Sequence, residues 1–175
     1  QNGVANERVA LRYFPNVHGV TVMMPATYLE PGEVITHGAP CYGLFALGRY
    51  PGGTDAADEA LKQALERANI AAFTSEEVMR TKYGKLLMNL GNIVDALLPL
   101  GVDRPRFTDR LKAEATAVFE AAGIGWEDVG LDNPQRKDVM QIVEIEGTPR
   151  PGSSTRQSLA RGAGSVETDY LNGEI

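Results

Sequence analysis

The first third of the chain alternates apolar and polar residues in short stretches, a pattern that predicts β-strands. Residues 20–24 and 34–37 flank Pro31-Gly32, a pair that is typical of a type II turn. A third apolar run, residues 42–47, is expected to extend the same sheet. The chain therefore begins with a small β-rich region.

Helical spacing replaces the alternation after this region. Thr54 or Asp55 is expected to cap a surface helix that continues to Ala68, with acidic residues early and a basic residue late. Residues 70–73 predict a short strand. The part that combines strands with one helix therefore extends to about residue 73.

From Thr74 onward the pattern predicts mainly helices. Thr74 and Glu77 have the spacing of a capping box, which predicts the start of a long helix that Pro99 ends. Asp103 is expected to open another helix, and Gly123 is expected to close it.

The remaining residues have a weaker pattern. Residues 125–152 are expected to be mostly loop with one short helix, and short helices are expected over residues 153–161 and from residue 165 onward. The whole pattern predicts an α+β fold, with a strand-rich part over residues 1–73 and an all-α part over residues 74–175.

A narrow polar stripe interrupts the apolar surface of the long helix. Lys85, Asn89 and Asn92 are four and three residues apart, so at about 100° per residue their side chains fall within roughly 60° of one another. Apolar side chains cover most of the remaining circumference: Leu86, Leu87, Met88, Leu90, Ile93, Val94, Leu97 and Leu98. This pattern predicts a helix that is packed inside the protein.

A lysine on such a helix needs a compensating interaction, because removing an ammonium group from water costs several kcal/mol. The sequence leaves two explanations open. Lys85 can extend to water along its apolar stem while Asn89 and Asn92 bond to neighbouring backbone groups. Alternatively, the three side chains form one wall of a polar cleft that binds a ligand.

Composition and charge narrow the range of partners. The 175 residues are 43% hydrophobic and carry a net charge of −6 without a basic cluster, so nucleic acid is not an expected partner. The longest apolar run, residues 93–102, contains Asp95 and Pro99 and is too short to span a bilayer; no signal peptide is evident.

Cysteine and histidine usage favours neither disulfides nor a metal. The single cysteine, Cys41, has no internal partner, which favours a reducing cytoplasm. His18 and His37 lack a metal-ligand spacing, so no metal site is expected. The chain opens without methionine and its last residues continue a helical pattern, so we expect a piece of a longer protein.

Three motifs are distributed over nearly the whole chain: Gln1-Asn2-Gly3, Lys85-Leu86-Leu87-Met88-Asn89, and Ser153-Ser154-Thr155-Arg156-Gln157 followed by residues 167–173. Their order and spacing resemble the ketopantoate reductase (2-dehydropantoate 2-reductase) family. The resemblance implies that residues 1–73 are the end of a Rossmann domain that holds NADPH. It also implies that residues 74–175 form a helical domain similar to that of 6-phosphogluconate dehydrogenase.

The resemblance implies roles for individual residues. Lys85 is expected to donate a proton to the substrate ketone, Asn89 to bind the substrate, and Ser154 to contact its carboxylate. Glu167 is expected to orient the substrate and the lysine and to lie near the nicotinamide ribose, and Asn2 is expected to lie beside the nicotinamide. An ammonium group suits this chemistry, since it stabilises and then protonates the developing oxyanion.

The chain departs from the family pattern in two places. Family members often carry another asparagine eight residues after the lysine, where this chain has Ile93; Asn92 is expected to bind the substrate in its place. The segment between Ser154 and Glu167 is also longer. No Gly-x-Gly-x-x-Gly motif follows a strand, so this chain by itself is not expected to bind NADPH normally or to be active.

The activity that the resemblance implies is NADPH-dependent reduction of a 2-keto acid, namely ketopantoate to pantoate in pantothenate and coenzyme A biosynthesis. Two alternatives stay open. Lys85 can form a Schiff base with a keto acid, or the leucine-rich helices can form a dimerisation or ligand-binding module. If the chain self-associates, a homodimer formed through the helical part is expected.

Overall fold

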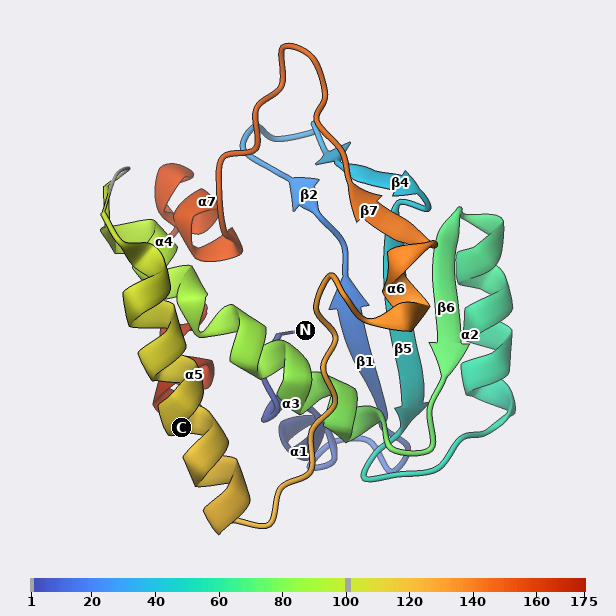
Figure 1. The fold of residues 1–175 in the computed structure, drawn as a ribbon. Helices are drawn as coiled ribbons and strands as arrows, with labels where there is room; N and C mark the ends of the chain where they lie inside the picture. Colours follow the sequence, from blue (N-terminus) through green and yellow to red (C-terminus); the bar gives the residue numbers. More distant parts are fainter. Residues whose placement is uncertain (1, 100–101) are drawn as a thin grey trace.

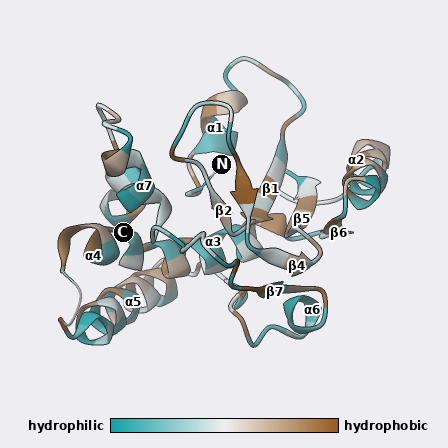
Figure 2. Cartoon of the chain, turned by 90° about the horizontal axis from the view of Figure 1, so that it is seen from above, coloured by the Kyte–Doolittle hydropathy of each residue, from teal (hydrophilic) through white to brown (hydrophobic). Residues whose placement is uncertain are grey.

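The computed structural model describes residues 2–99 and 102–175. A central helix, α3, runs between α5 on one side and the main sheet on the other (Figures 1 and 2). Gln1, the first residue of the amino-terminal motif, lies outside the described residues. The expected α+β fold is confirmed.

The main sheet has three strands in the order β1-β5-β6. β1 (His18–Met23) pairs antiparallel with β5 (Gly43–Arg49), and β5 pairs parallel with β6 (Ile70–Thr74). Parallel strands require a crossover connection, which α2 (Ala56–Arg67) supplies. α2 packs along the outer side of β6 and β5 (Figure 1).

Two short antiparallel pairs extend the strand-rich side. β2 (Ala26–Thr27) pairs with β3 (Ile35–Thr36), and β4 (Gly38–Pro40) pairs with β7 (Met140–Ile142). β7 lies within residues 125–152, where only loop and a short helix were expected. Three residues are too few to show a period of two, and the partner strand is distant in sequence, so no local pattern indicates this strand.

The polar stripe lies on two helices instead of one. α3 (Val78–Asn89) and α4 (Gly91–Leu97) follow each other with an interruption at Leu90. The predicted end of the helical run before Pro99 is confirmed, because Leu98 already has extended backbone angles.

The caps of these helices agree only partly with the prediction. The side chain of Asp55 caps α2 and accepts hydrogen bonds from the backbone N–H groups of Ala57 and Asp58. The predicted capping box at Thr74 and Glu77 is wrong. Thr74 ends β6 and Glu77 makes no side-chain cap, because pairing with β5 holds Thr74 in the sheet.

The other helices surround α3 and α4. The predicted helix that opens at Asp103 is α5, and Gly123 follows it with φ of 66° as expected for its end. The expected last helix is replaced by two 3₁₀ turns. The remaining bounds are α1 Asn6–Ala10, α5 Arg104–Ala121, α6 Pro134–Lys137, α7 Ser154–Ala160, η1 Glu167–Tyr170 and η2 Asn172–Glu174.

α3 contributes to two apolar clusters, and this confirms that the helix is packed inside the protein. Leu86 and Leu87 face a cluster that includes Phe119 of α5. Met88 packs against a second cluster on the sheet side, which includes Met23 and Met140. Figure 2 shows hydrophobic residues on β1. Lys85 and Asn89 therefore lie on a helix held from two sides.

The two predicted parts of the chain are joined by the pairing of β4 with β7, since these strands come from residues 1–73 and 74–175 respectively. The boundary near residue 73 stays a prediction. Within the described ranges, no helix has the length and apolar character needed to cross a bilayer.

Gly84 lies where residues 124–130 cross α3. A Cβ atom at this position would stand 1.7 Å from the backbone oxygen of Glu127, closer than any real contact. We expect Gly84→Ala to destabilise the protein by more than the usual 1 kcal/mol of an average substitution, because the backbone of the crossing segment must move.

Thermal unfolding of the two variants Gly84→Ala and Gly164→Ala tests this expectation. Gly164 has open space around its Cβ position, so its substitution is the matched control. Equal melting temperatures for the two variants would contradict the close approach at Gly84.

Candidate active site

A cleft of about 320 Å³ opens beside α3 and α4, bounded by the end of β1, the start of α7 and the segment that carries α6 and β7. Five of the six predicted site residues line it: Asn2, Lys85, Asn89, Asn92 and Ser154. The sixth, Glu167, lies next to Asn2. The structure therefore brings together residues from three distant motifs.

Lys85 is mostly buried at the wall of this cleft. Burial, together with the nearby charges of Lys82 and Arg136, lowers the pKa of its ammonium group to about 8, although the charge of Glu167 opposes these effects. In the described ranges the Lys85 ammonium makes no hydrogen bond or ion pair with another side chain. It is therefore available to a ligand as a proton donor.

Glu167 is held near the cleft by Asn2. The Asn2 side chain donates a hydrogen bond of 3.1 Å from Nδ2 to Oε2 of Glu167. The neighbouring Gly3 has φ of 76°, and a Cβ atom there would lie 2.7 Å from the carbonyl oxygen of Tyr170. Only glycine allows this approach, so the Asn2-Gly3 motif packs directly on the turn that contains Glu167.

Asn92 and Ser154 meet across the cleft. Nδ2 of Asn92 donates to Oγ of Ser154 at 3.3 Å, although Asn92 lies on α4 and Ser154 on α7. Ser154 is not occupied as the helix cap, because Ser153 is the N-cap of α7 and its side chain accepts from the backbone N–H of Arg156. Ile93, the departure from the family pattern, is not among the residues that line the cleft.

Asp95 fixes α7 against α4 and thereby places Ser154. Its carboxylate accepts hydrogen bonds from the Ser153 backbone at 2.8 Å and from Arg104 at 2.9 Å, and it pairs with Arg156 at 3.4 Å. Burial alone raises the pKa of Asp95, but the hydrogen bonds from Ser153 and the charges of Arg156 and Arg104 hold that pKa below its usual value.

Asn89 has an unused donor. The residue is 9% exposed, and its Nδ2 atom is buried without a hydrogen-bond partner in the described structure. A buried amide without a partner is costly, because its desolvation is not compensated. This donor at the wall of the cleft therefore favours a ligand that accepts a hydrogen bond.

The sequence analysis assigned no role to Arg136, Arg150 and Gln157, which are polar residues that line the cleft. Gln157 ties α7 to the strand side, because its Oε1 accepts from the Tyr28 backbone and its Nε2 donates to the Ala26 carbonyl. Arg136 and Arg150 belong to a segment without periodicity, and no local signal in the sequence distinguishes them from arginines that lie at the surface.

A buried ion pair lies behind Lys85. Glu7 of α1 and Lys82 of α3 are 5% and 3% exposed, and the Lys82 ammonium donates directly to Oε1 of Glu7. The pair connects α1, which follows the Asn2 motif, to the helix that carries Lys85. The ion pair between Glu7 and Lys82 therefore helps to hold Asn2 and Lys85 at the wall of the same cleft.

His18 is not among the residues that line this cleft, and it contacts two carboxylates. Its Nδ1 is 2.7 Å from Oδ1 of Asp58, and its Nε2 is 3.8 Å from Oδ2 of Asp55. These atoms lie close enough to one another to hold a metal ion. The hydrogen bond to His18 and the helix cap at Asp55 and Asp58 already account for the arrangement.

The comparisons with known proteins agree with the motifs. No protein-family model matches the chain. The whole chain is 26% identical, over 180 aligned residues, to the 2-dehydropantoate 2-reductase of Pyrococcus horikoshii and covers 57% of that protein. The chain thus spans somewhat more than half the length of the curated relatives it matches.

Solved structures show the same fold. A ketopantoate reductase from Ralstonia eutropha JMP134 superposes with a TM-score of 0.69 at 26% identity, over 99% of this chain and 56% of the other. A D-mandelate dehydrogenase in complex with NADH superposes with a TM-score of 0.71 at 20% identity, over 99% of this chain and 59% of the other. The resemblance to the ketopantoate reductase family is confirmed.

The ion pair between Glu7 and Lys82 can be tested by a double-mutant cycle. We expect Lys82→Met to lower the free energy of unfolding by about 3–5 kcal/mol, because it leaves the buried Glu7 carboxylate without the cation that faces it. The double variant Lys82→Met/Glu7→Leu is expected to recover most of this loss. Urea unfolding measures both, and additive losses would show that the two residues are not coupled.

Proposed function

We propose that this chain supplies the substrate-binding and proton-donating part of a nicotinamide-dependent 2-keto acid reductase of the ketopantoate reductase type. The observation that carries the proposal is the mostly buried Lys85 ammonium in a cleft that also contains Asn2, Asn89 and Ser154. The similarity of the whole chain to 2-dehydropantoate 2-reductases supports it.

The proposed reaction is the reduction of ketopantoate to pantoate, a step of pantothenate and coenzyme A biosynthesis, in the cytoplasm. The substrate is a small keto acid whose carbonyl oxygen accepts hydrogen bonds. Lys85 and the unused Nδ2 donor of Asn89 lie on the same wall of the cleft and suit such an acceptor.

NADPH is the proposed cofactor, and the residues present fit its nicotinamide end. The exposed carboxylate of Glu167 suits ribose hydroxyl donors, and its hydrogen bond with Asn2 holds both residues at the cleft. When bound, the cofactor supplies a hydride. The phosphate-binding glycine motif is not part of this sequence, so we propose that this chain by itself is inactive.

The residues of the chain perform the proton chemistry. As the keto carbon is reduced, negative charge develops on its oxygen; the Lys85 ammonium stabilises this charge and transfers a proton from Nζ to that oxygen. A pKa of about 8 suits this transfer, because the group is protonated at neutral pH yet gives up its proton more readily than an exposed lysine.

A lysine with this lowered pKa is also suited to form a Schiff base, so the alternative of a covalent keto acid adduct is tested separately. Borohydride treatment with the keto acid traps such an adduct at Lys85. The reductase proposal expects no adduct. Self-association through the helical part stays a prediction that sedimentation can test.

The catalytic role of Lys85 predicts a large loss of activity on substitution. In the full-length protein, Lys85→Met is expected to lower the rate of NADPH oxidation with ketopantoate by about 10²- to 10⁴-fold, the usual contribution of a general acid. Lys112→Met, which removes an exposed lysine of α5, is the matched control. Wild-type turnover in Lys85→Met would exclude Lys85 from the mechanism.

The lowered pKa of Lys85 also predicts a pH dependence. The reduction needs the protonated amine, so kcat/KM is expected to be level below pH 8 and to fall about tenfold per pH unit above it. Oxidation of the hydroxy acid needs the neutral amine and is expected to rise through the same pKa. Steady-state kinetics in both directions measure this, and parallel profiles would contradict the assignment.

A further inference from the structure

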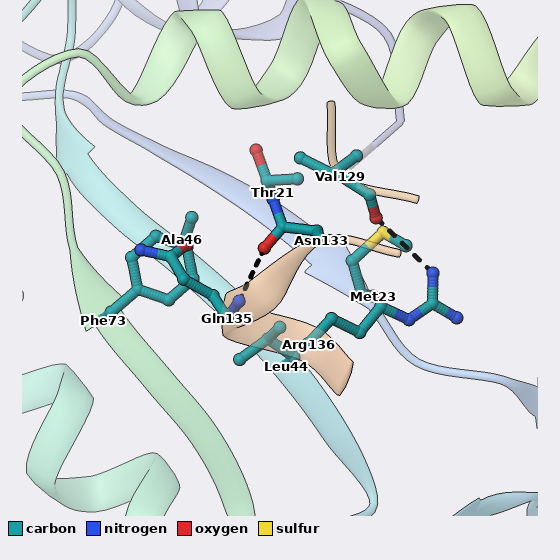
Figure 3. Close-up of a pocket in the computed structure, with 9 residues that line it drawn as sticks. All are labelled: Thr21, Met23, Leu44, Ala46, Phe73, Val129, Asn133, Gln135 and Arg136. Atoms are coloured by element: carbon teal, nitrogen blue, oxygen red, sulfur yellow. Dashed lines mark hydrogen bonds between the residues drawn. The ribbon is translucent and has the colours of Figure 1, made fainter. Parts of the chain in front are cut away.

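Arg136 is a buried cation without a counter-charge. It is 3% exposed, and no carboxylate in the described ranges forms an ion pair with it. Its Nε atom is buried and has no hydrogen-bond partner among the described residues. One long bond of 3.4 Å, from Nη1 to the Val129 carbonyl, is the contact drawn in Figure 3. Four of the five guanidinium N–H donors are left for other partners.

The surroundings of Arg136 explain how it is held. Arg136 belongs to the short helix α6. Asn133 caps this helix, because its side chain accepts a hydrogen bond of 2.8 Å from the backbone N–H of Gln135. Figure 3 shows the side chain beside Met23 and Leu44, which line an apolar pocket of about 20 Å³. The stem is therefore packed against apolar groups, and the charge is fixed in place.

The same residue also lines the cleft that contains Lys85, together with the exposed Arg150. Among the residues that the structure describes, no aspartate or glutamate lines this cleft. Burial lowers the pKa of Arg136, and the charge of Arg150, which lines the same cleft, lowers it further. Three cations that line one cleft without an acidic residue repel one another, and an anionic ligand would offset this repulsion and their desolvation.

We propose that Arg136, with Arg150 beside it, is the carboxylate subsite of the cleft and anchors the acid group of the 2-keto acid. This inference rests on the proposed function and extends it, because the motifs assign the carboxylate to the neutral hydroxyl of Ser154. A guanidinium group offers two parallel donors that match a carboxylate, and it supplies the opposite charge. Ser154, which already accepts from Asn92, is then a secondary contact.

Binding of two small analogues tests the subsite without turnover. Oxamate carries the carboxylate of a 2-keto acid, whereas oxamide has the same size and no charge. We expect the full-length protein, in calorimetric titrations, to bind oxamate about 10- to 100-fold more tightly than oxamide. In Arg136→Met this preference is expected to disappear, while the affinity for oxamide stays unchanged.

Two further variants separate the subsite from a general effect on folding. Arg150→Met changes an exposed side chain and is expected to lower the preference for oxamate by about threefold. Arg110→Met, an exposed arginine of α5, is the matched control and is expected to keep the wild-type preference. Unchanged oxamide binding shows that Arg136→Met is folded.

The outcomes distinguish this subsite from the reductase proposal. A preference for oxamate that survives in Arg136→Met, an equal loss of both analogues, or no oxamate binding by the wild type overturns the subsite. If oxamate binding depends on Arg136 but the full-length protein does not oxidise NADPH with keto acids, the subsite is supported and the reductase function is overturned.

Discussion

The rest of the site depends on the cost of keeping the Lys85 ammonium largely out of water. That cost is met neither by a direct ion pair nor by a hydrogen bond within the described ranges, and the lowered pKa of Lys85 reflects it. The helix that carries Lys85 is packed between two apolar clusters, so the position of its backbone beside the cleft is fixed. An ammonium in this position is poised to give its proton to a bound oxygen.

The surrounding structure provides rigidity for this arrangement. The buried pair of Glu7 and Lys82 connects α1 to α3, and Asp95 connects α4 to α7 through Ser153 and Arg156. These polar connections are directional, so they specify how the elements meet more narrowly than apolar packing does. Residues from both ends of the chain consequently face one cleft.

Positive and negative side chains have different places at the cleft. Cations line it without an acidic neighbour, while Glu167 lies just outside and is tied to Asn2. A negatively charged ligand is therefore favoured inside, and one carboxylate remains at the edge to moderate the pKa of Lys85. This division suits a small acid that must be both held and protonated.

The sequence alone predicted the buried helix and its polar stripe, because a period of 3.6 residues is a local property that Lys85 and Asn89 display directly. It also predicted the cap at Asp55 and the helix end at Gly123, where the chemistry is confined to a few neighbouring residues. Only the tertiary structure decided the strand β7, the failure of the Thr74 cap, and the place of Arg136, since each depends on a partner distant along the chain. Interactions between residues that are close in sequence can be predicted from the sequence pattern. The burial and the electrostatic environment of a side chain arise only when distant segments come together in the folded chain.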